Sequence, residues 1–383
     1  MAGMRKMRQY GWMGLLLASV FITGIVWQRV MTPRVVNPVS PVSRVAMSDP
    51  VDPGTSLGGR LAPNFTLTDQ FGQAVSLSQF RGKVVVLAFV DSQCTNICPL
   101  TTMTMLEALH MLGPQAASHV QLLGVNANPT ATSVADVKNF SQLHGLEHAW
   151  LFATGTPAQL TPVWRRYFIY VQVVHNLIDH TPALYVIDTH GREQRIFLTS
   201  THYNVVGPEA SALAASIARY LPASLRPAHL PHIPYKPTTY SPSSPVTLPR
   251  LTASGQRGRV TLRPATPRLT VFVASWAPQA AQELTLLNQV QRALPAIRIT
   301  AVDVGSTEPR TNAIFPVLRA AGRLAYPVVL DAAGNLAQAY GVADIPWLTL
   351  TNAHGKIIWS HDGWLTTAPD LEHAVALALS TSP

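Results

Sequence analysis

Apolar runs of strand length alternate with amphipathic stretches of helical spacing over most of the chain. From residue 58 to 221, the pieces FTL and VSL around Gly72 alternate apolar and polar positions and predict a short hairpin. The runs that predict buried strands here are 84–90, 122–126, 150–155 and 183–188. The stretches that predict helices are 134–143, 157–168 and 209–220. Strands that alternate with helices indicate an α/β fold with a mostly parallel sheet.

The second half of the chain, residues 251–383, repeats this order of elements. Its predicted elements are strands at 269–276, 297–304, 326–330 and 347–351, and a helix at 278–294. The piece HTPALYVIDTHGR, which begins at His180, aligns with DIPWLTLTNAHGK, which begins at Asp344. Both have proline in third position and end on a His-Gly-basic turn. An internal repeat of this size indicates a duplicated fold, and therefore two tandem α/β domains.

The N-terminus carries a candidate membrane segment. A basic cluster that ends at Arg8 precedes the uncharged stretch Tyr10–Trp27, which has the minimum length for crossing a bilayer core of about 30 Å. Because basic flanks stay in the cytoplasm, we expect a single-pass anchor within residues 1–30 in the cell membrane, with the bulk of the chain outside the cytoplasm. A cleaved signal peptide is the alternative, although no small-residue cleavage site follows the apolar run.

Composition sets the domain limits and narrows the classes of function. Proline-rich stretches at 31–57 and 222–250 predict extended spacers, which leaves 58–221 and 251–383 as the two domains. Hydrophobic residues make up 47% of the chain, which is enough for buried cores without a disulfide. Charged residues are only 12% and the net charge is +9, without a basic stripe interleaved with aromatic residues. We therefore expect no nucleic-acid partner.

The two cysteines of the chain, Cys94 and Cys98, lie in the segment CTNICP directly after the predicted strand 84–90. Pro99 fits the first turn of a helix, so both thiols belong to a strand end and a helix start. Backbone N–H groups and the helix dipole favour the thiolate at such a place. Three uses are open: a permanent disulfide, a redox couple, or a pair of soft ligands that select Cu(I). Outside the cytoplasm, a lone cysteine pair is more often a disulfide or a dithiol couple than a metal site.

Two further segments carry a resemblance to known proteins. The segment APNFTLTDQFGQAVSLSQFRGK, with the strand and cysteine turn that follow it, resembles the thioredoxin-like fold. Within that fold, CTNICP together with DHTPALYVIDTHG resembles the Sco/SenC family of copper chaperones, over nearly all of residues 58–221. The resemblance implies that Cys94, Cys98 and His180 bind copper, as Cu(I) or Cu(II). It also implies that Pro182 packs against the cysteine turn as a cis peptide.

Polar neighbours of these residues are candidates to support the ligands. Asp91 precedes the cysteine turn and Asp179 precedes His180. We interpret both, with Pro182, as residues that contact the metal ligands and orient or tune them. Ordinary turn hydrogen bonding is the alternative. Many Sco-like proteins carry an aspartate pair after the third strand, where this chain has GVNANPT. Its two asparagines supply no negative charge, so a redox or partner role of those carboxylates does not carry over.

The resemblance implies a membrane-anchored copper chaperone, rather than an enzyme, that supports the assembly of cytochrome c oxidase by passing copper to its copper-bearing subunit. The alternative is a thiol-disulfide reductase, which would use the Cys94–Cys98 couple to keep the cysteines of an acceptor protein reduced. A structural adaptor with a permanent disulfide is the third interpretation. Fold and motif alone do not fix the acceptor.

Residues 251–383 resemble the thiol-disulfide oxidoreductase branch of the thioredoxin-like fold, with FVASWAPQAAQEL at the active-site turn. The repeat places residues without thiol or imidazole at the three ligand positions, namely Ala277, Ala281 and Asp344. We expect Pro346 to be cis and this degenerate domain to dock a protein partner, which is the first domain, the oxidase or another assembly factor. Trp276 and Trp347 are candidates for an apolar patch at that docking surface, with burial in the core as the commoner fate of such tryptophans.

Overall fold

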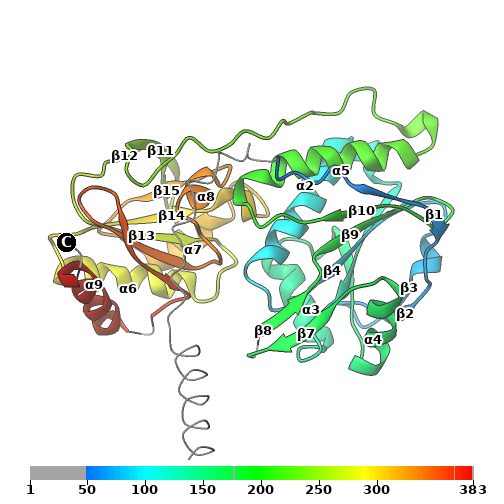
Figure 1. Ribbon diagram of the computed structural model, residues 1–383, viewed down its shortest axis with the longest axis horizontal. Helices are drawn as coiled ribbons and strands as arrows, with labels where there is room; N and C mark the ends of the chain where they lie inside the picture. Colours follow the sequence, from blue (N-terminus) through cyan, green and yellow to red (C-terminus); the bar gives the residue numbers. More distant parts are fainter. Residues whose placement is uncertain (1–48, 176, 366, 382–383) are drawn as a thin grey trace, which may run out of the picture. The chain divides into compact units, whose positions relative to one another are not determined.

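Two large β-sheets organise the part of the chain that the structure describes, which is residues 49–175, 177–365 and 367–381 (Figure 1). The structure is a computed structural model. Residues 49–383 form one compact unit that contains both sheets. The predicted membrane segment Tyr10–Trp27 lies outside the described residues, and no helix within them is long and apolar enough to cross a membrane.

The first sheet has the strand order β1-β10-β9-β4-β5-β6. Its strands are β1 (Thr55–Leu61), β4 (Val84–Val90), β5 (Val120–Asn126), β6 (Trp150–Ala153), β9 (Ala183–Ile187) and β10 (Arg192–Leu198). The strands β4, β5 and β6 are parallel, whereas β9 is antiparallel to both β4 and β10. Two hairpins complete this domain, namely β2 (Thr66–Thr68) with β3 (Ala74–Ser76), and β7 (Val171–Val174) with β8 (Leu177–His180).

Helices cover both faces of the first sheet. They are α2 (Ile97–Ala117), α3 (Val134–Leu143), α4 (Pro157–Arg166) and α5 (Val206–Tyr220), with short 3-10 turns η1 (Leu77–Phe80), η2 (Tyr203–Val205) and η3 (Ala223–Leu225). Side chains of β4 alternate between the faces: Val86 and Ala88 join the core under α2, α3 and α5, and Leu87 joins the core under α4. A strand covered on both sides is apolar at every position, as all seven buried residues of β4 are.

The second sheet has the order β12-β11-β15-β14-β13-β16-β17. Its strands are β11 (Val246–Thr252), β12 (Gly255–Leu262), β13 (Arg268–Val273), β14 (Arg298–Asp303), β15 (Val328–Leu330), β16 (Trp347–Thr351) and β17 (Ile357–Asp362). Its helices are α6 (Ala280–Ala293), α7 (Ile314–Ala321), α8 (Asn335–Ala339) and α9 (Ala368–Thr381), with the 3-10 turn η4 (Gly305–Thr307). The strands β13, β14 and β15 are parallel, and β16 is antiparallel to β13, so the central pattern of the first sheet is repeated.

The α/β class with two thioredoxin-like sheets is therefore confirmed. Periodicity missed the outer strands β1, β10, β12 and β17, and β11 begins at Val246, inside the stretch predicted as a spacer. The Ile345–Pro346 peptide is cis, as expected. It is the only cis peptide among the described residues, so the expectation of a cis bond before Pro182 was wrong. The limits of the two domains remain a prediction.

The two sheet domains share buried apolar surface. The core under α2 and α5 is continuous with the core of the second sheet. Trp276 is 3% exposed, and its ring centroid lies 4.9 Å from that of His144, at the end of α3. Of the two alternatives for Trp276, burial in the core is therefore the one that the structure confirms, and His144 of the first domain packs against its ring. Burial lowers the pKa of His144 to about 3, so this ring is neutral at physiological pH and packs as an aromatic surface.

A buried carboxyl joins α2 to α5 and gives a test of this packing. Glu209 is 6% exposed and accepts hydrogen bonds from the Ser200 backbone N–H at 3.1 Å and the Thr104 hydroxyl at 3.5 Å. Burial raises the pKa of Glu209 to about 8, while the bond from Ser200 opposes the shift. A raised folded-state pKa contributes stability that is complete below the ordinary value and is lost as the pH rises through about 8.

We predict that Glu209→Gln, which cannot ionise, is more stable than the wild type at pH 8 by about 1–3 kcal/mol, with the difference shrinking towards pH 5. Urea unfolding followed by tryptophan fluorescence at several pH values measures this. The control is Glu107→Gln, a change at an exposed position of α2, which should give no gain that grows with pH. A Glu209→Gln effect that is the same at pH 5 and pH 8 would contradict the prediction.

Candidate metal centre

The cysteine turn connects the central strand β4 to the helix α2. Asn96 caps the helix: its side-chain oxygen accepts the Ile97 backbone N–H at 2.5 Å and the Cys94 thiol at 3.1 Å. Cys98, the second residue of α2, donates its backbone N–H to the Cys94 sulfur at 3.3 Å. Both cysteines are free thiols; Cys94 is half-buried and Cys98 is 1% exposed. The predicted position at a strand end and helix start is thus confirmed.

His180 reaches the same place from the β7–β8 hairpin. It is the last residue of β8, just before β9, and its Nε2 lies 3.6 Å from the Cys98 sulfur. The Nδ1 of His180 lies 3.2 Å from the Thr181 carbonyl oxygen, which can only accept a hydrogen bond. Nδ1 therefore carries the ring proton, and the lone pair of Nε2 faces the Cys98 thiol.

Burial sets the protonation of this pair. Burial, followed by the hydrogen bond and charge of Cys94, raises the pKa of the Cys98 thiol well above its ordinary value. Burial also lowers the pKa of His180, against the opposing contact with the Thr181 carbonyl. At Cys98, burial outweighs the helix N-terminus that was expected to favour the thiolate. The site therefore presents a neutral thiol and a neutral imidazole, and a cation that binds there must displace the thiol proton.

A cavity of about 330 Å³ opens onto these groups. It is lined by Cys94 and His180, by the three predicted supporting residues Asp91, Asp179 and Pro182, and by Tyr203 and Ala343. The structure thus brings all the predicted supporting residues to one cavity. As they stand, no three His, Cys, Asp or Glu side chains of the described residues are close enough together to hold a metal ion. Cys98 already contacts both other members of the predicted trio, through its thiol and through its backbone N–H.

Comparison with known proteins identifies the first sheet domain. The sequence model of the SCO1/SenC family matches residues 54–219. These residues are an SCO1/SenC domain. The chain is 25% identical over 167 residues to the mitochondrial SCO2 homolog of Bos taurus, a match that covers 42% of this chain and 59% of that protein.

Other similarities concern single regions of the chain. The thiol-disulfide oxidoreductase ResA of Halalkalibacterium halodurans is 27% identical over 97 residues, which cover 25% of this chain and 53% of that protein. The chain thus spans about half the length of the curated relatives it matches. A structure of ScoI from Bradyrhizobium japonicum with copper bound is 26% identical, covers 42% of this chain and 99% of that chain, and has a TM-score of 0.37.

The asparagines of the GVNANPT segment have a structural role in the Sco domain. Asn128 is 1% exposed and donates to the Asp91 carboxylate at 2.7 Å, while its own oxygen accepts the backbone N–H of Thr130 and Ala131. Asn126 is fully buried and donates to the Ala131 carbonyl oxygen at 2.7 Å. These amides therefore hold the loop after β5 and bind the carboxylate of Asp91, a contact that the sequence did not suggest.

Tyr203 is the site residue that sequence reasoning missed. It is 2% exposed, lines the cavity with Cys94 and His180, and its hydroxyl has no hydrogen-bond partner among the described residues. Burial, and then the nearby Asp344, raise the pKa of Tyr203, with a smaller contribution from Cys94. No spacing or motif marks this tyrosine, because it comes from η2, more than one hundred residues after the cysteine turn.

Three other side chains with atoms that can bind copper do not line this cavity. Met103 and Met105 are buried in the core on α2, and His175 is exposed at the turn of the β7–β8 hairpin. The two methionines belong to the same buried cluster as Cys98 and pack there as apolar side chains, whereas His175 is a surface residue.

We predict that Asn128→Asp destabilises the Sco domain at pH 7 by about 1–3 kcal/mol, because it replaces a buried donor with a second carboxylate against Asp91. Like charges raise the pKa of one carboxyl, so the loss should disappear as the pH falls and that group binds a proton. Urea unfolding at pH 7 and pH 4.5 measures the effect. Asn128→Ala is the control, since it loses the hydrogen bonds at both pH values alike; an equal loss for Asn128→Asp at both would contradict the argument.

Proposed function

We propose that the chain is a membrane-anchored copper chaperone, outside the cytoplasm, that holds one copper ion on Cys94, Cys98 and His180. The proposal further holds that it passes the ion to the copper-bearing subunit of cytochrome c oxidase. The observation that carries the proposal is the Nε2 lone pair of His180, which faces the Cys98 sulfur at 3.6 Å. Similarity to Sco proteins supports it, since one such protein has a structure with copper bound.

The donor set fits copper as a cargo. Two thiolates and one neutral imidazole are soft ligands that select Cu(I), and the tautomer of His180 leaves Nε2 free to bind. Cys94 must turn from Asn96 towards the ion, a rotation of one side chain at the mouth of the cavity. Since Cys94 is half-buried and Cys98 is buried, an incoming acceptor ligand replaces Cys94 first, and Cys98 and His180 hold the ion until the transfer is complete.

The reductase is a second candidate, supported by the two free thiols. In that reaction the Cys94 thiolate attacks an acceptor disulfide and releases one acceptor thiol. The Cys98 thiolate then attacks the mixed disulfide, which leaves a Cys94–Cys98 disulfide and a fully reduced acceptor. The half-buried position of Cys94 suits the first step, and the buried position of Cys98 beside it suits the second. Similarity to a thiol-disulfide oxidoreductase adds support.

We predict that His180→Ala weakens copper binding by the reduced protein at least about 10-fold, because it removes one ligand of three, while the dithiol couple still cycles. Titration with Cu(I) against a competing chelator measures the affinity, and reduction of a model disulfide measures the couple. The matched control is His175→Ala, an exposed histidine of the same hairpin, which should change neither. If His180→Ala left both copper stoichiometry and affinity unchanged, the metal site would be rejected and the reductase favoured.

The anchor is proposed from the stretch Tyr10–Trp27, which precedes the described residues. We predict that the full chain stays in the membrane fraction after carbonate extraction, with an intact N-terminus. Ala18→Arg, near the centre of the stretch, should release it, because a central arginine costs about 2.5–3.5 kcal/mol of insertion free energy. Ser19→Leu should stay inserted. A soluble mature form that begins beyond residue 30 would reject the anchor in favour of a cleaved signal peptide.

A further inference from the structure

One loop of the second sheet domain lies at the mouth of the copper cavity. Ala343 lines the same cavity as Cys94 and His180. The next residue, Asp344, lies near the side chain of Thr95, which directly follows Cys94 in the cysteine turn; burial raises the pKa of Asp344 to about 6, and Thr95 opposes that shift. The carboxylate of Asp344 accepts the Ile345 backbone N–H at 2.7 Å, which fixes its direction. The second domain therefore contacts the turn that carries the proposed ligands.

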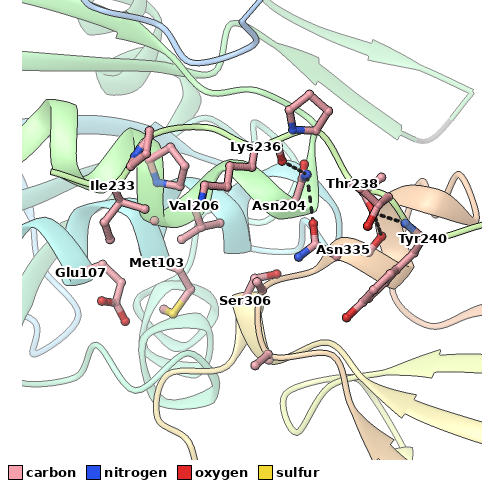
Figure 2. A pocket seen from close by; sticks show the side chains of 18 of the residues that line it. Met103, Glu107, Asn204, Val206, Ile233, Lys236, Thr238, Tyr240, Ser306 and Asn335 are labelled. Atoms are coloured by element: carbon pink, nitrogen blue, oxygen red, sulfur yellow. Dashed lines mark hydrogen bonds between the residues drawn. The ribbon is translucent and has the colours of Figure 1, made fainter. Parts of the chain in front are cut away.

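A second contact runs through η2, the segment that brings Tyr203 to the cavity. The Tyr203 backbone N–H donates to the Gln338 side chain of α8 at 3.1 Å. The Asn204 side chain donates to the Asn335 side-chain oxygen at 3.3 Å and to the Lys236 carbonyl oxygen at 3.5 Å, as Figure 2 shows. The same short segment thus supplies one wall of the copper cavity and holds the start of α8.

The face of the second domain that makes these contacts is the one that corresponds to a cysteine site. The internal repeat sets Asp344 at the position of His180 and Ala277 at the position of Cys94. Ala277 is 5% exposed, and its neighbour Trp276 packs on His144 of the Sco domain. Since this face carries no thiol, it is free to be covered by another surface.

The interface is not closely packed throughout. A cavity of about 690 Å³ lies beside the contacts of η2, between α2, the linker and the loop before α8; it is lined among others by Met103, Val206, Ile233, Ser306 and Asn335 (Figure 2). Next to it, the domains are joined by single hydrogen bonds. This part of the interface therefore opens at a lower free energy than the continuous apolar core that joins the two domains elsewhere.

We propose that the second sheet domain is a cap built into the chain, whose loop 343–344 limits the access of outside ligands to Cys94 and His180. The cap acts mainly through Ala343, which lines the cavity with Cys94 and His180 and narrows its mouth, while Asp344 places a carboxyl beside Thr95 of the cysteine turn. An acceptor protein that takes the ion from Cys94 must displace this loop, so the cap sets the rate of exchange. The effect of the cap on copper exchange rests on the proposed function, whereas its effect on the accessibility of the Cys94 thiol does not.

Glycine at position 334 allows a sharp test. At Gly334, which precedes α8, a Cβ would lie 2.4 Å from the Tyr203 carbonyl oxygen and 2.6 Å from the Ser306 hydroxyl, with φ at 70°. Gly334→Ala therefore pushes α8 away from η2. The matched control is Gly341→Ala, which has a φ of 66° and no atom within 4 Å of the added Cβ. Both changes carry the same backbone strain, and only the first disturbs the interface.

We predict that iodoacetamide alkylates Cys94 at least about threefold faster in Gly334→Ala than in Gly341→Ala or the wild type, because the thiol becomes more accessible. The experiment uses the full chain in detergent, reduced and copper-free, with the Cys94 adduct quantified by mass spectrometry. Asp344→Ala, which removes the carboxyl beside Thr95 without adding volume, should increase the rate in the same direction and carries the test if Gly334→Ala does not fold. Loss of Cu(I) to bathocuproine disulfonate should accelerate in the same order.

The two proposals fail separately. Equal alkylation rates in all these proteins would overturn the cap, whether or not the chain binds copper. Faster alkylation in Gly334→Ala and Asp344→Ala, in a protein that binds no copper, would support the cap and overturn the chaperone function. Copper binding with the expected His180 dependence, but with unchanged alkylation and exchange rates, would leave the chaperone function in place and reject the cap.

Discussion

The contact between the Cys98 sulfur and the His180 ring joins residues 82 positions apart in sequence, and the arrangement of the Sco domain follows from it. β4 runs into the cysteine turn, and β9 begins three residues after His180. Because β4 and β9 are antiparallel neighbours, with Ala88 opposite Leu184, the end of one strand meets the start of the other. Both strands are buried along their whole length, and burial on both faces fixes their register. The sheet core, rather than the loops, therefore sets the distance between thiol and imidazole.

The same burial decides the charges that the site tolerates. On the proposed function, a Cu(I) ion with two thiolates and a neutral imidazole would carry one net negative charge, beside a thiol, Cys98, whose pKa burial already raises. Asp91 adds a further carboxylate at the edge, and Asn128 donates to it. Carboxylates in place of Asn126 and Asn128 would add negative charge to this buried region, where each unpaired charge is costly. Asn126 and Asn128 keep the hydrogen bonds of the loop after β5 without adding negative charge. The negative charge of the proposed site then comes from its two thiolates.

Much of this arrangement follows from local sequence. The burial of β4 on both faces and the apolar run of β9 are properties of a few adjacent residues, so the hydrophobic pattern finds them. The position of His180 and the cis Pro346 followed from a resemblance and a repeat. The outer strands β1, β10, β12 and β17 have mostly exposed or half-buried positions, so their hydrophobic pattern is weak. Tyr203, the Asp91–Asn128 bond and the burial of Trp276 depend on contacts between distant segments, which no local pattern encodes.

The duplicated fold explains why the second domain fits where it does. On the proposed function, the face of the Sco domain at the end of β4 must remain partly open, so that an ion and its acceptor can reach Cys94. In the second domain, the corresponding face has alanine at the thiol positions and a tryptophan beside them, which removes the need for access and supplies apolar surface to bury. His144, neutral through burial, is a matching surface on α3. The second domain thus has a binding face at the place where the first domain has its cysteine site. Asp344, which the repeat sets at the position of His180, lies near the cysteine turn of the first domain.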